Sequence, residues 1–257
     1  MKPLRVTFRL MLLVIHIFIG LLIVLVFGHQ RDGQIPQGRF QRAVCWWLGR
    51  IPRIAGVRVH ARGVPAQGPV LVVSNHVSWL DIPVLGGLAP VGFLSKAEVR
   101  HWPLVGWLAA RTGTLFIHRG AHAASAVTQC ITENLEQGRR VHVFAEATTT
   151  DGTDVRRFHP RLLAAALDTG SPIQPVAIRY LPTPDGRPSP APYIDDDVLF
   201  HHALRVLAEP RLDVEVSFLP PIAAADQDRR SLADAAHQAV RAVVVDEATP
   251  ARDRAHI

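Results

Sequence analysis

The sequence predicts an α/β protein: a mostly parallel central sheet flanked by helices, with an N-terminal membrane-anchoring helix and an interfacial amphipathic helix before it. From residue 57 onward, short apolar runs alternate with helical segments, which is the pattern of a parallel sheet covered on both faces. Residues 10–27 are apolar except for His16, a length near the lower limit for crossing a bilayer. Residues 39–54 combine arginines with an apolar helical stripe.

The apolar segment at residues 10–27 has two interpretations. Lys2, Arg5 and Arg9 before it resemble the charged start of a signal peptide. The apolar run is longer than usual for such a peptide, and no small-residue cleavage site follows, so we expect a retained anchor. More arginines follow the segment than precede it, which places the downstream domain on the cytoplasmic face of a bacterial inner membrane.

The stripe in residues 39–54 is expected to lie at the membrane interface, next to the anchor. The alternative is a basic amphipathic helix packed on the domain itself. Its apolar members recur at helical spacing: Phe40, Val44, Trp47, Leu48 and Ile51.

Charge is concentrated at the N-terminus. Residues 1–63 hold ten lysines and arginines against one aspartate, a balance of +9; the total is +6, which leaves −3 for the rest. A basic quarter beside an apolar segment indicates anionic membrane lipids as partners. Nucleic acid would need basic residues spread over the domain, so we expect no nucleic-acid partner. Cys45 and Cys130 support neither a disulfide framework nor a metal site, and no cofactor is expected.

Three regions are expected: an anchor and interfacial helix at 1–56, an α/β domain at 57–246 and a loose tail at 247–257. The predicted strands are 57–60, 70–73, 92–95, 114–117, 141–144, 174–180 and 212–219. The predicted helices are 98–111, 121–137, 160–168 and 231–245. The Pro- and Gly-rich stretch 181–197 is predicted to be a surface excursion.

One candidate site stands where the strand at 70–73 ends. His76 follows this strand closely, and Asp81 lies five residues further on. A histidine at a strand end with a carboxylate beside it can form a general base. Positions five apart do not share a helix face, so the pair requires a turn that folds back. Chance can supply this spacing, and Asp81 could instead cap a helix that has Pro83 in its first turn.

Two other predicted strands deliver charged residues, Arg119 and Glu146, to their carboxyl ends. Because the carboxyl ends of strands converge on the ligand crevice of an open α/β sheet, His76, Arg119 and Glu146 are expected to share one site.

Four short blocks stand in order over roughly residues 35–220, and through them the sequence resembles the glycerolipid acyltransferase family. The Glu-x-Thr-Thr-x-Asp-Gly pattern at residues 146–152 and the segments 155–166 and 193–200 are most similar to the branch of this family that acylates lyso-ornithine lipids. The matches to the four family blocks and the linker, in chain order, are Asn75, His76 and Asp81; Lys96, Glu98, Pro103 and Gly106; Gly113, Phe116, Ile117 and Arg119; Phe144, Glu146 and Thr148; and Pro175. Each block is weak alone, but four in order are a specific signal.

The resemblance implies a membrane enzyme that moves a fatty acyl group from a thioester of acyl carrier protein or coenzyme A to a lysolipid hydroxyl. It implies that His76 is the base, that Asp81 orients it, and that Arg119 and the Glu146 loop bind the acceptor. The chemistry suits these residue types, since a hydroxyl attacks a thioester poorly until a neutral histidine takes its proton. An acidic acyl carrier protein is the expected donor, attracted by the basic surface.

The third block departs from the family. It usually reads Phe-Pro-Glu-Gly-Thr-Arg-Ser, whereas residues 144–150 read Phe-Ala-Glu-Ala-Thr-Thr-Thr. Thr149 replaces an arginine credited with holding phosphate, and this favours a phosphate-free ornithine-type acceptor. Ala147 replaces a glycine and is strained if the backbone there needs a positive φ.

Two other functions stay open. If Arg156 or Arg157 supplies the missing charge, the acceptor is 1-acyl-sn-glycerol-3-phosphate. The altered block also permits an inactive membrane lipid-binding protein. We interpret residues 195–202, which hold three aspartates and two histidines, as a solvated acidic turn with surface histidines rather than a metal site.

Overall fold

The computed structural model describes residues 2–27, 35–117, 123–194 and 196–246. The helical elements are α1 (Lys2–Phe27), α2 (Gly38–Ala55), α3 (Asp81–Leu88), η1 (Ala97–His101), α4 (Val105–Arg111), α5 (Ala123–Glu136), η2 (Pro160–Leu163), α6 (Ala164–Thr169), α7 (Leu199–Ala208), α8 (Arg229–Arg241) and η3 (Ala242–Asp246). The strands are β1 (Val57–Arg62), β2 (Val70–Ser74), β3 (Gly92–Lys96), β4 (Leu115–Ile117), β5 (Arg140–Phe144), β6 (Ile173–Tyr180) and β7 (Leu212–Phe218).

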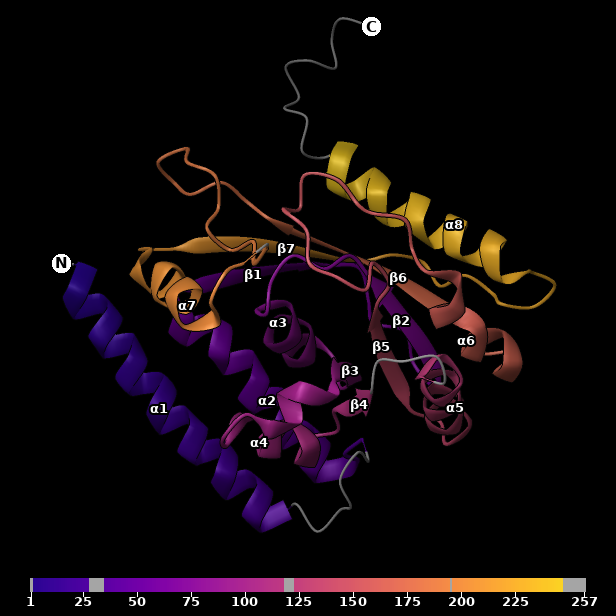
Figure 1. The fold of residues 1–257 in the computed structure, drawn as a ribbon, viewed down its shortest axis with the longest axis horizontal. Helices are drawn as coiled ribbons and strands as arrows, with labels where there is room; N and C mark the ends of the chain where they lie inside the picture. Colours follow the sequence, from indigo (N-terminus) through magenta and orange to yellow (C-terminus); the bar gives the residue numbers. More distant parts are fainter. Residues whose placement is uncertain (1, 28–34, 118–122, 195, 247–257) are drawn as a thin grey trace, which may run out of the picture.

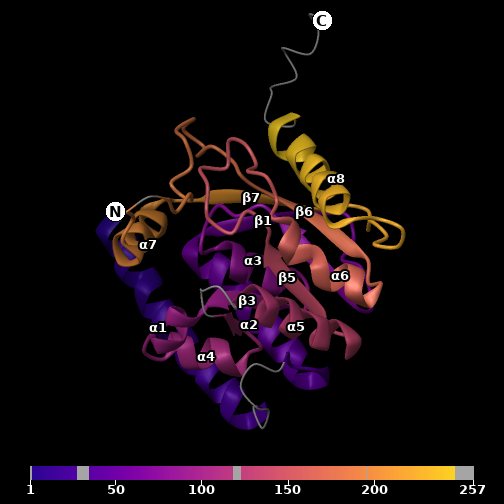
Figure 2. The same ribbon diagram turned by 45° about the vertical axis from the view of Figure 1, so that its right-hand side comes forward.

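The strands form one seven-stranded sheet in the order β1-β7-β6-β2-β5-β3-β4. Every neighbouring pair is parallel except β6 and β7. Helices cover both faces, with α5, α6 and α8 on one side and α2, α3 and α7 on the other (Figures 1 and 2). The predicted fold class, a mostly parallel sheet flanked by helices, is confirmed.

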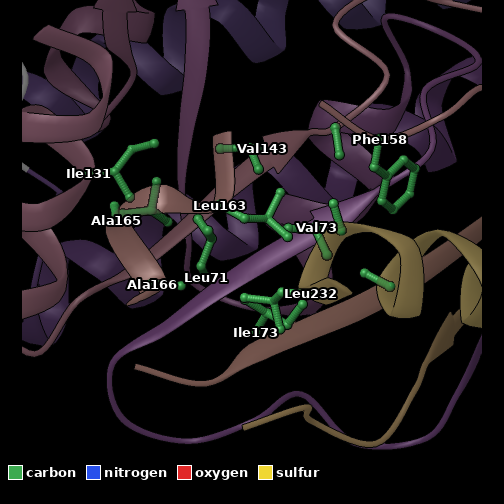
Figure 3. Close-up of a cluster of buried hydrophobic side chains, with 14 of the residues drawn as sticks. Leu71, Val73, Ile131, Val143, Phe158, Leu163, Ala165, Ala166, Ile173 and Leu232 are labelled. Atoms are coloured by element: carbon green, nitrogen blue, oxygen red, sulfur yellow. The ribbon is translucent and has the colours of Figure 1, made fainter. Parts of the chain in front are cut away.

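β2 shows why the strands could be found from sequence. All five of its residues are buried, because alternate side chains enter different cores. Leu71 and Val73 join the cluster under α5, α6 and α8, which Figure 3 shows together with Ile131, Leu163 and Leu232. Val70 and Val72 enter the opposite cluster. Two buried faces produce the continuous apolar run that marks a central parallel strand.

α1 is, within the described part of the chain, the one helix long and apolar enough to cross a membrane by length and composition. One of its faces packs on the protein, and its exposed apolar side chains recur at intervals of three and four: Leu4, Phe8, Met11, Ile15, Phe18, Leu22 and Leu25. His16, the polar interruption, is buried; its Nε2 lies 2.8 Å from the Trp47 carbonyl oxygen, and Trp47 Nε1–H donates to the His16 carbonyl at 2.8 Å.

Both ends of α1 contact the α/β domain or its neighbour α2. Arg5 donates to the Ala208 carbonyl (2.6 Å), and Arg9 donates to the carbonyls of Leu207 (2.9 Å) and Glu209 (2.6 Å), where α7 ends. Guanidinium groups suit this position, because the last carbonyls of a helix lack intrahelical partners. At the other end, Phe27 stacks on Phe40 of α2.

The apolar stripe of α2 packs inside the protein, so the prediction that this stripe faces the membrane is wrong. Phe40, Val44 and Trp47 are buried in a cluster with α1 and α4. On its other side α2 meets α3 at Gly49 and Gly87, where a Cβ on Gly87 would lie 2.3 Å from the Gly49 Cα. Glycine is required because the two backbones touch.

Two other expectations need correction. The helix predicted at 98–111 is two pieces, η1 and α4, because Leu104 adopts a φ of 58° after Pro103. Pro175 is the third residue of β6. The Pro175 carbonyl accepts from the Leu219 N–H (3.0 Å), just beyond the end of β7. Because β7 has ended on this side of β6, the N–H that proline lacks removes no hydrogen bond of the β6–β7 ladder. Helices α3 and α7 were not predicted.

Candidate active site

The predicted His–Asp pair forms. After β2 the chain turns back, so that Asp81, the first residue of α3, faces His76. Asp81 Oδ2 accepts from His76 Nδ1 at 2.8 Å. The same oxygen accepts the backbone N–H groups of Val77 (2.8 Å) and Ser78 (2.9 Å). The carboxylate therefore organises the turn as well as the imidazole.

Tyr180 completes the surroundings of Asp81. Its hydroxyl donates to Asp81 Oδ1 at 2.8 Å from the end of β6, and Asp81 is fully buried. Burial and the neighbouring carboxylate raise the pKa of Tyr180 well above its ordinary value, so the phenol stays a neutral donor. Tyr180 was not predicted as a site residue; the available signal was its place at the carboxyl end of a predicted strand.

This arrangement gives His76 a defined tautomer. A carboxylate accepts but does not donate, so Nδ1 carries the proton and Nε2 of the neutral ring keeps its lone pair. The imidazole stacks on the Phe144 ring, with 3.7 Å between centroids and 15° between planes, and the side chain is 18% exposed. A histidine held in this way can accept a proton from a bound hydroxyl.

His142 supports the Phe144 ring from below. The two rings meet edge to face at 4.5 Å. The Ser74 hydroxyl donates to the Asn75 carbonyl (2.8 Å), so at 3.0 Å it must accept from His142 Nε2–H. Complete burial lowers the pKa of His142 to about 3, so this ring stays neutral. Within the described parts of the chain its Nδ1 has no hydrogen-bond partner.

The loop after β5 holds the backbone of His76 on both sides. Glu146 Oε1 accepts the His76 N–H (2.7 Å), and Oε2 accepts the Arg156 N–H (2.8 Å). Burial raises the pKa of Glu146, while those two amides act in the opposite direction. The Thr150 N–H donates to the His76 carbonyl at 2.9 Å. Thr150 was not predicted as a site residue, although it belongs to the altered third block at residues 144–150.

The loop between these contacts is tight. Ala147 has a φ of 57°, the left-handed conformation that the family's glycine adopts without strain. Thr148 is exposed and Thr149 is half-buried. The departure from the family pattern therefore places a strained alanine in the loop that binds the His76 backbone, and an uncharged threonine at position 149.

Asn75 and Pro175 have backbone partners. The Asn75 side chain exchanges two hydrogen bonds with the backbone of Ile178, at 2.9 and 2.8 Å, and is fully buried. It thereby joins the end of β2 to β6. Pro175 is opposite Val73 in the ladder, in the buried part of β6.

Only part of the second family block, which runs from Gly113 to Arg119, lies within the described residues. Arg119 lies outside the described residues, and so does the side chain of Lys96, whose backbone ends β3. Gly113 has a φ of 96°, which favours glycine. The Phe116 ring lies under the Arg100 guanidinium, 5.8 Å from its centroid.

Within the described residues, no group of three or more His, Cys, Asp or Glu is placed to hold a metal ion. His202, expected at the surface, is buried instead: it accepts from Trp79 Nε1–H (3.0 Å) and donates to the Pro192 carbonyl (2.9 Å). Tyr193 N–H donates to the Val77 carbonyl at 2.9 Å. The predicted surface excursion thus covers the turn that carries His76.

Together the fold and this His–Asp pair define an acyltransferase. The family profile described as Acyltransferase matches residues 56–179. The chain is also 47% identical over 215 residues to the lyso-ornithine lipid O-acyltransferase of Pseudomonas aeruginosa, with 83% of each chain covered. The chain belongs to the acyltransferase family, as the resemblance predicted.

The relatives of this chain carry the names of two different acceptors, lyso-ornithine lipid and 1-acyl-sn-glycerol-3-phosphate. The 1-acyl-sn-glycerol-3-phosphate acyltransferase of Neisseria gonorrhoeae is 31% identical over 220 residues, covering 84% of this chain and 86% of the relative. The crystal structure of the 1-acyl-sn-glycerophosphate acyltransferase PlsC from Thermotoga maritima superposes with a TM-score of 0.72. It is 21% identical, with coverage of 96% of this chain and 98% of that one, and supports the fold.

Proposed function

We propose that this protein is a membrane-bound O-acyltransferase that moves a fatty acyl group from a thioester of acyl carrier protein to the hydroxyl of a lyso-ornithine lipid. The observation that carries the reaction type is the His76–Asp81 pair, in which Nδ1 is bound and the Nε2 lone pair is left for the acceptor. The 47% identity to a lyso-ornithine lipid O-acyltransferase supports the acceptor.

In the proposed reaction, His76 Nε2 takes the proton of the acceptor hydroxyl as its oxygen attacks the thioester carbonyl. Asp81 holds the ring while it is an imidazolium. The tetrahedral intermediate then collapses, the C–S bond breaks, and the imidazolium returns the proton to the thiolate. The acceptor itself is the nucleophile, so no acyl-enzyme forms.

The loop at 146–152 supports an acceptor without phosphate. Thr149 stands where the family has an arginine, and it carries no charge. A second candidate acceptor is 1-acyl-sn-glycerol-3-phosphate. The exposed Arg156 and Arg157 beside Glu146 favour it, because they could replace the missing cation.

The exposed apolar face of α1 supports membrane attachment. Arg5 and Arg9 bind the end of α7, and Phe27 stacks on α2, so both ends of α1 stay with the same body. We place α1 in one leaflet, on the cytoplasmic face where an acyl carrier protein is available. The basic N-terminal quarter favours anionic headgroups on that face.

The test uses purified protein, labelled acyl thioesters of carrier protein and of coenzyme A, and a panel of lysolipids. Transfer to lyso-ornithine lipid with little transfer to 1-acyl-sn-glycerol-3-phosphate is expected. The reverse preference would replace the proposed acceptor with the second candidate. Transfer to neither by a folded protein would remove both enzyme proposals, and a wild-type rate in His76→Ala would remove the base assignment.

A further inference from the structure

Two residues of opposite charge, Asp151 and Arg156, are each connected to His76 through one intermediate residue that binds the His76 backbone. Thr150 donates to the His76 carbonyl, and Asp151 is the next residue. Gly152 follows against Val77, where an added Cβ would lie 3.2 Å from the valine side chain. On the other side, the Arg156 N–H binds the carboxylate that also binds the His76 N–H. The backbone positions of Asp151 and Arg156 are thus tied to the base.

Their side chains are available to a ligand. Both residues are exposed, and no salt bridge joins them or ties either to another described residue. Asp151 Oδ1 accepts from the backbone N–H (3.0 Å) and hydroxyl (2.8 Å) of Thr153. These bonds and the nearby Arg156 charge lower the pKa of Asp151, so it stays an anion at neutral pH. The neighbouring Asp154 differs, because Arg241 already pairs with it at 2.7 Å.

This charge pattern complements an amino-acid headgroup better than a phosphate. Ornithine joined to a fatty chain through its α-amine keeps a side-chain ammonium and a carboxylate. A carboxylate beside the site attracts the ammonium and repels a phosphate, while a guanidinium can bind the carboxylate in a bidentate manner. Neither charge alone would favour a zwitterion.

We propose that Asp151 and Arg156 are the headgroup-binding residues of this enzyme, with Asp151 binding the ammonium and Arg156 the carboxylate of an aminoacyl lysolipid. The proposal rests on the proposed function and adds the residues that select the acceptor. Asp151 follows Thr150 in the chain and the Arg156 N–H binds Glu146, and both Thr150 and Glu146 bind the His76 backbone; headgroup binding therefore places the acceptor at a fixed position relative to the base.

The experiment compares three acceptors: lyso-ornithine lipid, its norvaline analogue, which lacks the ammonium, and its ornithinamide analogue, which lacks the carboxylate. Wild-type enzyme is expected to lose roughly 10-fold or more in kcat/KM on each analogue, the range for a hydrogen bond to a charged group. Asp151→Asn keeps the oxygen that Thr153 binds, so the loop is preserved. It should lose about as much on the ornithine substrate and nothing further on the norvaline analogue.

Arg156→Gln keeps the backbone bond to Glu146. Its kcat/KM should fall about as much on the ornithine substrate, and should fall no further on the ornithinamide analogue. Asp154→Asn, whose carboxylate already pairs with Arg241, is the matched control on the same loop and is expected to leave the discrimination between acceptors unchanged. Non-additivity of this kind is the signature of a direct contact.

Each outcome decides a different question. If wild-type enzyme acylates all three acceptors equally well, the headgroup site is overturned and the proposed function stands. If Asp151→Asn loses the same factor on all three acceptors, Asp151 shapes the loop instead of binding the ammonium, and the assignment is overturned. If wild-type enzyme acylates 1-acyl-sn-glycerol-3-phosphate and not lyso-ornithine lipid, the proposed acceptor fails and this site fails with it.

Discussion

At the scale of single residues, His76 is fixed through its backbone and its ring at once. Glu146 and Thr150 bind its N–H and carbonyl, Asp81 binds Nδ1, and Phe144 lies against the ring face. The partners come from two segments of the chain, the start of α3 and the end of β5 with the loop that follows it. Such a histidine has little freedom to lose when substrate binds, which is the arrangement that efficient general-base catalysis requires.

The backbone of Ala147 is strained, and this strain lowers the stability of the fold. Its φ of 57° is unfavourable for alanine by about 1–2 kcal/mol. Ala147→Gly relieves this strain but adds freedom to the unfolded chain, so we expect a net gain of up to about 1 kcal/mol in the free energy of unfolding. Denaturant titration measures it. Ala225→Gly, at an exposed turn residue without positive φ, is the control and should not stabilise; a destabilised Ala147→Gly would contradict the strain.

His142 predicts how stability depends on pH. Its pKa is lowered to about 3 in the folded protein, while an unfolded histidine titrates near 6.5. The unfolded chain therefore takes up this proton first, so stability is complete above pH 6.5 and falls as the pH drops toward 3. Linkage gives a loss of about 2 kcal/mol between pH 7.5 and 5.0 from this residue alone.

His142→Phe keeps an aromatic edge against Phe144 and removes the titration. Its free energy of unfolding should differ less between pH 7.5 and 5.0 than that of the wild type, by about 2 kcal/mol. The lost bond to Ser74 lowers stability at both pH values and cancels in the difference. Equal pH dependence in the two proteins would show that His142 is protonated in the fold.

At the scale of elements, the contact between α2 and α3 determines where Asp81 lies. Gly49 and Gly87 let these two helices touch backbone to backbone, and α3 begins at Asp81. Gly87→Ala places a methyl group 2.3 Å from the Gly49 Cα, and neither backbone can yield cheaply. We expect a loss of about 1–3 kcal/mol in stability, the range for an overpacked contact, together with a fall in kcat as α3 shifts.

Thermal unfolding and steady-state kinetics check this prediction together. Ala208→Ser, at the end of a helix remote from the α2–α3 contact, is a control for a one-atom addition to a small residue. A fully active Gly87→Ala protein of unchanged stability would contradict the tight contact and the positioning role of α2.

The elements also show which parts of the fold could be predicted from the amino-acid sequence. Buried parallel strands such as β2 are apolar throughout, and they were found because their pattern is local. The stripe on α2 is equally regular, but periodicity does not tell whether lipid or protein covers it. Tyr180 and Thr150 contact Asp81 and His76 across 99 and 74 residues of sequence, so no local pattern marked them. His76 and Asp81 were found because they are only five positions apart and the family motif supports the pair.

At the scale of the whole molecule, α1 packs on the protein with one face and exposes apolar side chains on the other. One face packs along the body, from Arg5 and Arg9 at the end of α7 to Val24 and Phe27 near α2. The other face exposes an apolar stripe from Leu4 to Leu25. A helix that crossed the bilayer would have to carry one of its ends, and the elements bound there, to the far side.

The last prediction tests that topology. In protein whose Cys45 and Cys130 are replaced by alanine, single cysteines are introduced at Lys2 or at Gln37, just before α2. Because both ends of α1 contact the same body, a membrane-impermeant maleimide added to inside-out membrane vesicles should label both positions, and added to sealed right-side-out vesicles it should label neither. Labelling of the two positions from opposite sides would show that α1 spans the bilayer, and the contacts of Arg5 and Arg9 with α7 would then have to break in the membrane.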